Sequence, residues 1–166
     1  MAGILVPTPQ AGGMTLLASG SIAASATGFD LTNISSDYNE LWLYITNYSM
    51  SESAHIQCRI NNNSSTDYSH IYNSFSTAET ATSGATLIPM ANSVNSSQAG
   101  QSAWIRFPNY KNTTAYKHYE WAATRVDNEL WRGNGFNRST SAISRITVIS
   151  SAGTYDSGTY QLFGVK

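Results

Sequence analysis

The sequence predicts an all-β protein, an antiparallel two-sheet sandwich of the jelly-roll kind with an extended N-terminal arm. Apolar and polar residues alternate with period 2 in many short runs, and no run has the period of an amphipathic helix. Clusters of Gly, Asn, Asp, Ser and Thr interrupt the chain roughly every ten residues, as in sandwiches and barrels. Alternation favours antiparallel strands, which present one face to the core and the other to water.

The first 13 residues differ from the rest of the chain. Residues 1–13 combine a short apolar run with two prolines and a closing glycine pair. Proline fixes φ and removes a backbone donor, so we expect an extended arm here rather than a helix or a central strand. Residues 14–166 are then a single β-sandwich domain, a normal length for one domain. The arm's candidate contact residues toward a neighbouring subunit are Ile4, Leu5, Val6 and Pro7.

The clearest predicted strand covers residues 41–48. Leucines and an isoleucine fall on one of its faces, and Trp42 and Tyr44 fall on the other, so both faces carry large apolar groups. Two buried faces on one strand imply a second layer, from this chain or another. The next alternating run, 55–60, ends at the Asn-rich loop signal 61–65, and we expect the two runs to pair as neighbours.

The other strands are predicted from β-branched and aromatic residues between turn signals. Segment 74–101, rich in small and polar residues, is expected to be a long surface excursion, and Gly133-Asn134-Gly135 a hairpin turn. The last two runs, joined by 150–158, are expected to form a hairpin or a sandwich corner. The remaining predicted strands are 15–24, 68–75, 85–89, 102–108, 116–125, 130–136, 143–150 and 158–165.

Composition excludes several classes of function. Only 11% of the residues are charged and the net charge is -1, which is too weak a field to attract a polyanion, so we expect no nucleic-acid partner. Cys58 is the only cysteine, which excludes an intrachain disulfide framework and a cysteine-based zinc site; its apolar face makes it a small core residue. We find no signal-peptide pattern and no apolar run long enough to span a membrane, and expect neither export nor membrane attachment.

The sequence contains no convincing catalytic or metal-binding pattern, and we predict no cofactor. No G-x-S-x-G elbow accompanies the many serines. Asp67 and His70 are three residues apart, which on a strand places them on opposite faces. Glu120 with Glu129 or Asp127 has the chemistry of a glycosidase pair, but nothing in the sequence sets their separation. We therefore predict a protein that is not an enzyme.

The aromatic residues are the feature that exceeds the ordinary. The chain has 10 Tyr, 5 Phe and 4 Trp, and a second group, Tyr68 and Tyr72, shares a face with His70. Aromatic side chains build cores, but exposed ones anchor protein interfaces or stack on sugar rings. Our candidate interface residues on the strand with two apolar faces are Trp42, Tyr44 and Tyr48.

The chain resembles small virion proteins of tailed bacteriophages over residues 29–166. The closing segment is the most specific part: AISRITV at 142–148 and SGTYQLFGVK at 157–166 are similar to an "AIxRIxV…GTYxLYGIK" ending, with Phe163 in place of the more usual Tyr. The other similar segments are LWLYITNYS at 41–49, CRINN at 58–62 with Tyr68, and IRFPNY at 105–110.

The resemblance implies a β-sandwich structural component of a phage particle, assembled in the host cytoplasm. Our first expectation is a capsid decoration or cement protein that binds the major capsid protein shell, with the trimer as the favoured oligomer. The alternative is a tail-fibre or spike head that binds host surface glycan through exposed Tyr and Trp. A cell-wall-degrading enzyme is a third hypothesis, with no motif behind it.

Overall fold

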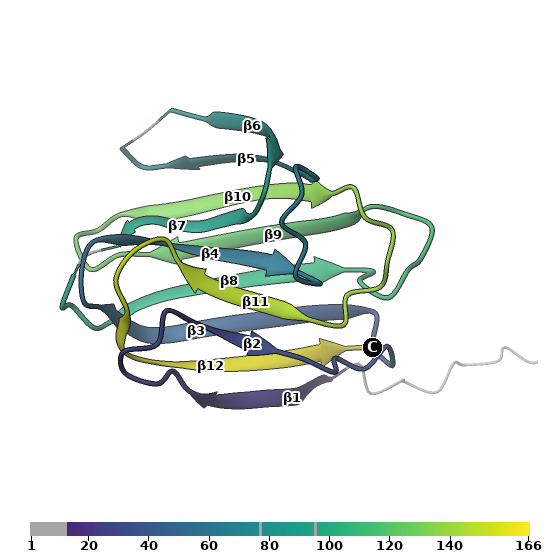
Figure 1. Ribbon diagram of the computed structural model, residues 1–166, viewed down its shortest axis with the longest axis horizontal. Helices are drawn as coiled ribbons and strands as arrows, with labels where there is room; N and C mark the ends of the chain where they lie inside the picture. Colours follow the sequence, from purple (N-terminus) through teal and green to yellow (C-terminus); the bar gives the residue numbers. More distant parts are fainter. Residues whose placement is uncertain (1–12, 77, 95) are drawn as a thin grey trace, which may run out of the picture.

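The computed structural model describes residues 13–76, 78–94 and 96–166, and in them all the regular secondary structure is β-strand. The predicted arm contacts therefore lie outside the described residues. Two antiparallel sheets, one of eight strands and one of four, face each other as a sandwich, with the smaller sheet in front of the larger in Figure 1. The predicted all-β sandwich is confirmed.

The twelve strands have four to eleven residues each and are closely spaced along the chain. In chain order they are β1 (Met14–Ser21), β2 (Gly28–Leu31), β3 (Glu40–Met50), β4 (Ala54–Ile60), β5 (Tyr68–Ser74), β6 (Thr80–Ala85), β7 (Ile88–Val94), β8 (Gln101–Pro108), β9 (Lys117–Thr124), β10 (Leu130–Asn137), β11 (Ile146–Ser150) and β12 (Tyr155–Val165).

The connectivity is that of a jelly roll with two added hairpins. The larger sheet has the order β1-β12-β3-β8-β9-β10-β5-β6, and the smaller sheet the order β2-β11-β4-β7. Setting aside two hairpins, the early strands pair with late ones in a nested series: β1 with β12, β2 with β11, β3 with β8, and β4 with β7. The hairpins β5–β6 and β9–β10 extend the larger sheet beyond β8, toward the top of Figure 1.

The core lies between the sheets and follows the period-2 pattern. Strands β3, β4, β8 and β9 alternate buried with less buried residues along most of their length. Ile56, Cys58 and Ile60 face inward from the smaller sheet, opposite Leu41 and Leu43 of the larger. Burial raises the pKa of the Cys58 thiol, as suits a small core residue rather than a nucleophile.

The expected pairing of 41–48 with 55–60 is wrong. Strand β3 pairs with β12 and β8 in the larger sheet, whereas β4 pairs with β11 and β7 in the smaller one. Alternation predicts which face of each strand is buried. That face is the same whether two consecutive strands pair in one sheet or lie in opposite sheets, so alternation does not distinguish the two arrangements. The last connection is a sandwich corner, because it joins β11 in the smaller sheet to β12 in the larger.

The expected hairpin turn at Gly133-Asn134-Gly135 is also wrong, because these residues lie inside β10. The turn between β9 and β10 comes earlier, where Arg125 N–H donates to the Glu129 carbonyl at 2.9 Å. A Cβ atom at Gly133 would lie 2.3 Å from Cζ2 of Trp121, so glycine is needed here for a close approach.

The segment 74–101 is more regular than expected. It contains β6 and β7, and the predicted strand 85–89 covers the turn between them. The short β2 was not predicted at all. Both missed strands lie at sheet edges. β2 has only four residues and β6 consists of small and polar residues, so the hydrophobic pattern that marks central strands is weak in them.

Candidate functional site

The outer face of the larger sheet, which points away from the smaller sheet, carries two rows of side chains that cross the strands. The register aligns them side by side. We call one the Trp42 row; from β12 to β10 it consists of Phe163, Trp42, Arg106, Glu120 and Asn134. We call the other the Trp104 row; from β12 to β5 it consists of Gln161, Tyr44, Trp104, Ala122, Arg132 and Asn73.

Four aromatic rings form a continuous platform at the β12–β3–β8 end of these rows. The Trp42 and Trp104 ring centroids are 5.4 Å apart, and those of Trp42 and Tyr44 are 5.9 Å apart and nearly parallel. Phe163 meets Tyr44 edge-on at 5.9 Å. All four side chains are partly exposed, so they leave aromatic surface open to a ligand on the solvent face.

Arg106 is held beside this platform by two carboxylates. Its Nη2 and Nε donate to Oε2 of Glu120 at 2.7 and 2.9 Å, and its Nη1 lies 3.4 Å from Oε1 of Glu40. Its Cζ lies 5.4 Å from the centre of the Trp42 ring. The hydrogen bonds that Arg106 donates to Glu120, together with the nearby negative charges, raise the pKa of Arg106. Because these groups are partly exposed, the pairs orient the guanidinium rather than add much stability.

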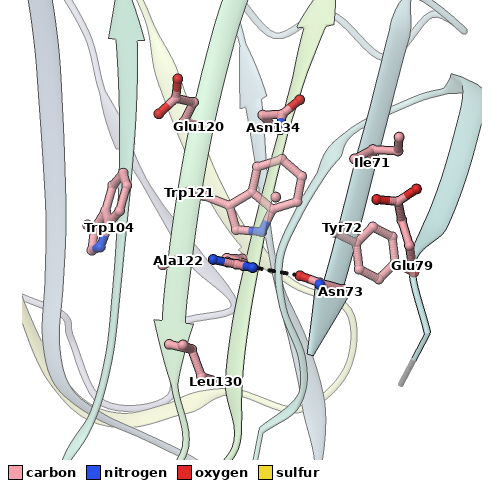
Figure 2. A pocket seen from close by; sticks show the side chains of 12 residues that line it. Ile71, Tyr72, Asn73, Glu79, Trp104, Glu120, Trp121, Ala122, Leu130 and Asn134 are labelled. Carbon is pink, nitrogen blue, oxygen red and sulfur yellow. Dashed lines mark hydrogen bonds between the residues drawn. The ribbon is translucent and has the colours of Figure 1, made fainter. Parts of the chain in front are cut away.

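A hollow of about 420 Å³ lies next to the platform, over β8, β9, β10 and β5 (Figure 2). Ala122 sits between Trp104 and Arg132 in the Trp104 row, and its short side chain leaves this space open. Trp104 stands on one side and Asn73 and Glu79 on the other, as Figure 2 shows.

Polar groups of both charges surround the hollow. Arg132 Nε donates a long hydrogen bond of 3.4 Å to Asn73 Oδ1, dashed in Figure 2, and Asn134, Glu120 and Glu79 also line the space. The site therefore offers aromatic groups from Trp104, Tyr72 and Trp121, amide donors and acceptors, one guanidinium and two carboxylates. Its volume falls within the ~300–1,000 Å³ of typical small-molecule pockets.

The structure brings two of the predicted interface residues together and separates the third. Trp42 and Tyr44 lie on the outer face, as the alternation predicts. Tyr48 is 0% exposed and lies in the core, so its side chain is not available to a partner. The register between β3 and β8 shifts between Thr46 and Tyr48, and the intervening Asn47 has φ 51°, so this bulge turns Tyr48 inward.

Most of the site could not be predicted from the sequence. Trp104, Arg106 and Ala122 lie on predicted strands, and the alternation there already separates them from core residues such as Phe107. What the sequence does not show is the order of the strands. Without that order, side chains up to about 120 residues apart in the chain cannot be recognised as one surface.

The second aromatic group packs inside the protein. His70 is buried beside Tyr72 and meets Trp121 edge-on at 6.0 Å, and its Nδ1 has no hydrogen-bond partner among the described residues. Burial lowers the pKa of His70. Asp67 instead accepts a hydrogen bond from Asn63 Nδ2 at 2.9 Å. These contacts describe a core rather than a metal site.

The acidic residues considered for glycoside hydrolysis each bind a different partner side chain. Glu120 pairs with Arg106, Asp127 lies 2.5 Å from Nη2 of Arg125, and Glu129 accepts a 2.7 Å hydrogen bond from the Ser76 hydroxyl. Across residues 13–76, 78–94 and 96–166, no three His, Cys, Asp or Glu side chains gather closely enough to hold a metal ion. No helix in the same part of the chain is long and apolar enough to cross a membrane.

Comparisons of this chain with protein-family models, with curated proteins and with solved structures gave no match.

Proposed function

We propose that this protein is a non-enzymatic virion component of a tailed bacteriophage that binds carbohydrate on the host surface through the outer face of its larger sheet. The observation that carries the proposal is the platform of Trp42, Tyr44, Trp104 and Phe163 beside a polar hollow. A sugar ring has an apolar face of C–H groups and a rim of hydroxyls. Aromatic rings match the face, and the amide and charged groups match the rim.

The resemblance of residues 142–148 and 157–166 to virion proteins supports the phage origin. These segments lie on either side of the sandwich corner and supply most of β11 and β12, which are interior strands of the smaller and larger sheets respectively. The resemblance favours neither head nor tail. The sequence alone favours capsid decoration, and the geometry of the outer face is our reason for placing glycan binding ahead of it.

Capsid decoration is the second candidate, and β1 favours it. Among the described residues β1 pairs only with β12, and Met14 and Leu16 on it are 47% and 49% exposed. An edge strand with exposed apolar side chains is suited to pairing with another chain, such as the major capsid protein or another copy in a trimer. Under this hypothesis Leu16→Lys weakens binding to capsids, while Trp104→Ala leaves it intact.

Purified protein should be tested against two probes: bacterial-surface polysaccharides, including neutral and acidic O-antigen chains, and phage heads that lack the protein. Our proposal expects polysaccharide binding that falls at least tenfold in Trp104→Ala. Tyr116→Ala is the matched control, because Tyr116 is an aromatic residue 53% exposed and outside both rows. Head binding without any polysaccharide binding would overturn the proposal in favour of capsid decoration.

A further inference from the structure

The two rows extend well beyond one sugar-sized site. The Trp104 row crosses six strands, from Gln161 on β12 to Asn73 on β5. Five interstrand gaps of ~4.8 Å give a track of roughly 24 Å. Aromatic rings occupy one end of the track and the hollow occupies the other. We infer that the outer face binds an internal stretch of a neutral polysaccharide laid across the strands, with one sugar residue seated over Ala122; this rests on the proposed function.

The small side chain of Ala122 leaves the space in which that sugar residue would bind. Its neighbours in the row are Trp104 on one side and Arg132 on the other, both long side chains that rise from the sheet. A side chain of similar length at position 122 would fill the space between them. Ala122 faces the outer surface and is only partly buried, so a larger residue there projects into the hollow instead of into the core. It is therefore a specificity-determining position.

The spacing of the rings favours a chain over a single terminal sugar. From Trp104 through Trp42 and Tyr44 to Phe163, successive ring centroids are 5.4 to 5.9 Å apart, with Phe163 meeting Tyr44 edge-on at the end of the series, so the four rings form one contiguous aromatic surface. A pyranose ring is about as long as the ~4.8 Å strand spacing, and a chain of roughly four to six residues would cover the track. A site for one terminal sugar needs no platform beyond the hollow.

The charges at the hollow favour a neutral chain. The lining holds two carboxylates, Glu79 and Glu120, and one guanidinium, Arg132. The nearby Arg106 is already paired with Glu120 and Glu40. The lining thus holds no excess of positive charge for a uronate or a phosphate. Hydroxyl and acetamido groups, by contrast, find donors and acceptors in Asn73, Asn134 and the charged side chains.

The test uses fragments of increasing length, prepared from the neutral O-antigen polysaccharide that binds most tightly to the full-length protein. Calorimetry on the wild-type protein should show affinity rising with length to about five residues and then levelling off. The corresponding monosaccharides should not displace the longer fragments from the protein, even at concentrations at which those fragments saturate it. An acidic polysaccharide of similar length should bind at least tenfold more weakly.

Ala122→Leu should lower the affinity for the longer fragments at least tenfold. The matched control is Ala81→Leu, the same change on the outer face of β6. Ala81 pairs with Ile71 but, unlike Ile71, is not among the residues that line the hollow. Thermal denaturation of both variants checks that folding is preserved. If Ala122→Leu disturbs folding, Ala122→Ser, which adds one hydroxyl, should still change the affinity while Ala81→Ser does not.

The outcomes separate the two proposals. Monosaccharides that compete as well as long fragments, stronger binding of acidic chains, or Ala122→Leu binding like wild type would each overturn the inference, although sugar binding through Trp104 would stand. If no polysaccharide binds at all, the proposed function itself fails and the inference fails with it.

Discussion

At the scale of single residues, close approaches decide where the smallest side chains stand. Gly135 and Gly133 lie on the inner face of β10, where Trp121 and Tyr119 of the neighbouring strand lean across them. In the sequence these glycines suggest a turn, because a turn and a close approach both call for glycine. The difference is visible only once Trp121 is known to pack there.

Gly135→Ala should destabilise the protein by about 1–3 kcal/mol, the usual cost of overpacking. The added Cβ would lie 2.3 Å from the Ser69 carbonyl oxygen and 2.8 Å from the Tyr119 ring, and a backbone oxygen cannot move aside easily. Urea denaturation measures the change. Gly13→Ala is the control, because nothing lies within 4 Å of its Cβ position; an equal effect in both variants would contradict this account.

His70 should make stability depend on pH. Burial lowers its pKa in the folded protein, whereas the unfolded chain has a value near ~6.5, so below that pH the unfolded state binds more protons. The free energy of unfolding should therefore decrease as the pH falls from 7.5 to 5. His70→Gln should reduce this dependence, measured by urea denaturation at each pH. A slope that is unchanged in the variant would show that other groups cause it.

At the scale of elements, the sequence predicts strands well and their partners poorly. Alternation locates most strands to within a few residues, including β8 and β9, because a buried face leaves a period-2 record. It does not record sheet membership, which is why the expected β3–β4 pair is wrong. Bulges are a second limit. Asn47 inserts one residue in β3 and reverses the side on which Tyr48 lies.

The bulge at Asn47 should tolerate glycine better than a β-branched residue. Its φ of 51° is in the left-handed region, which valine avoids, and its Oδ1 accepts a 3.0 Å hydrogen bond from Gly100 N–H. Asn47→Val should be less stable than Asn47→Gly by roughly 1–2 kcal/mol, since both variants lose the hydrogen bond but only valine adds backbone strain. Thermal and urea unfolding of the two variants measure the difference, and equal stabilities would argue against a strained bulge.

At the scale of the whole molecule, the fold explains how distant residues form one surface. The nested pairing brings β12, from the end of the chain, next to β3, and the β9–β10 and β5–β6 hairpins widen the same sheet. The widened sheet has more strands than the sheet that covers it, and its outer face carries the platform and the hollow. The sequence predicts Trp42 and Tyr44 as surface aromatics, but only the strand order joins them to Trp104, Ala122 and Arg132.

The most direct test of this account is calorimetric titration of a neutral O-antigen polysaccharide into the wild-type protein and into the double variant Trp42→Ala/Trp104→Ala. Both side chains are partly exposed on the outer face, so the variant should keep its fold, which circular dichroism checks. We expect saturable binding by the wild-type protein and its loss in the variant. Binding of equal affinity by the two proteins, or no binding of any surface polysaccharide by the wild type, would contradict it.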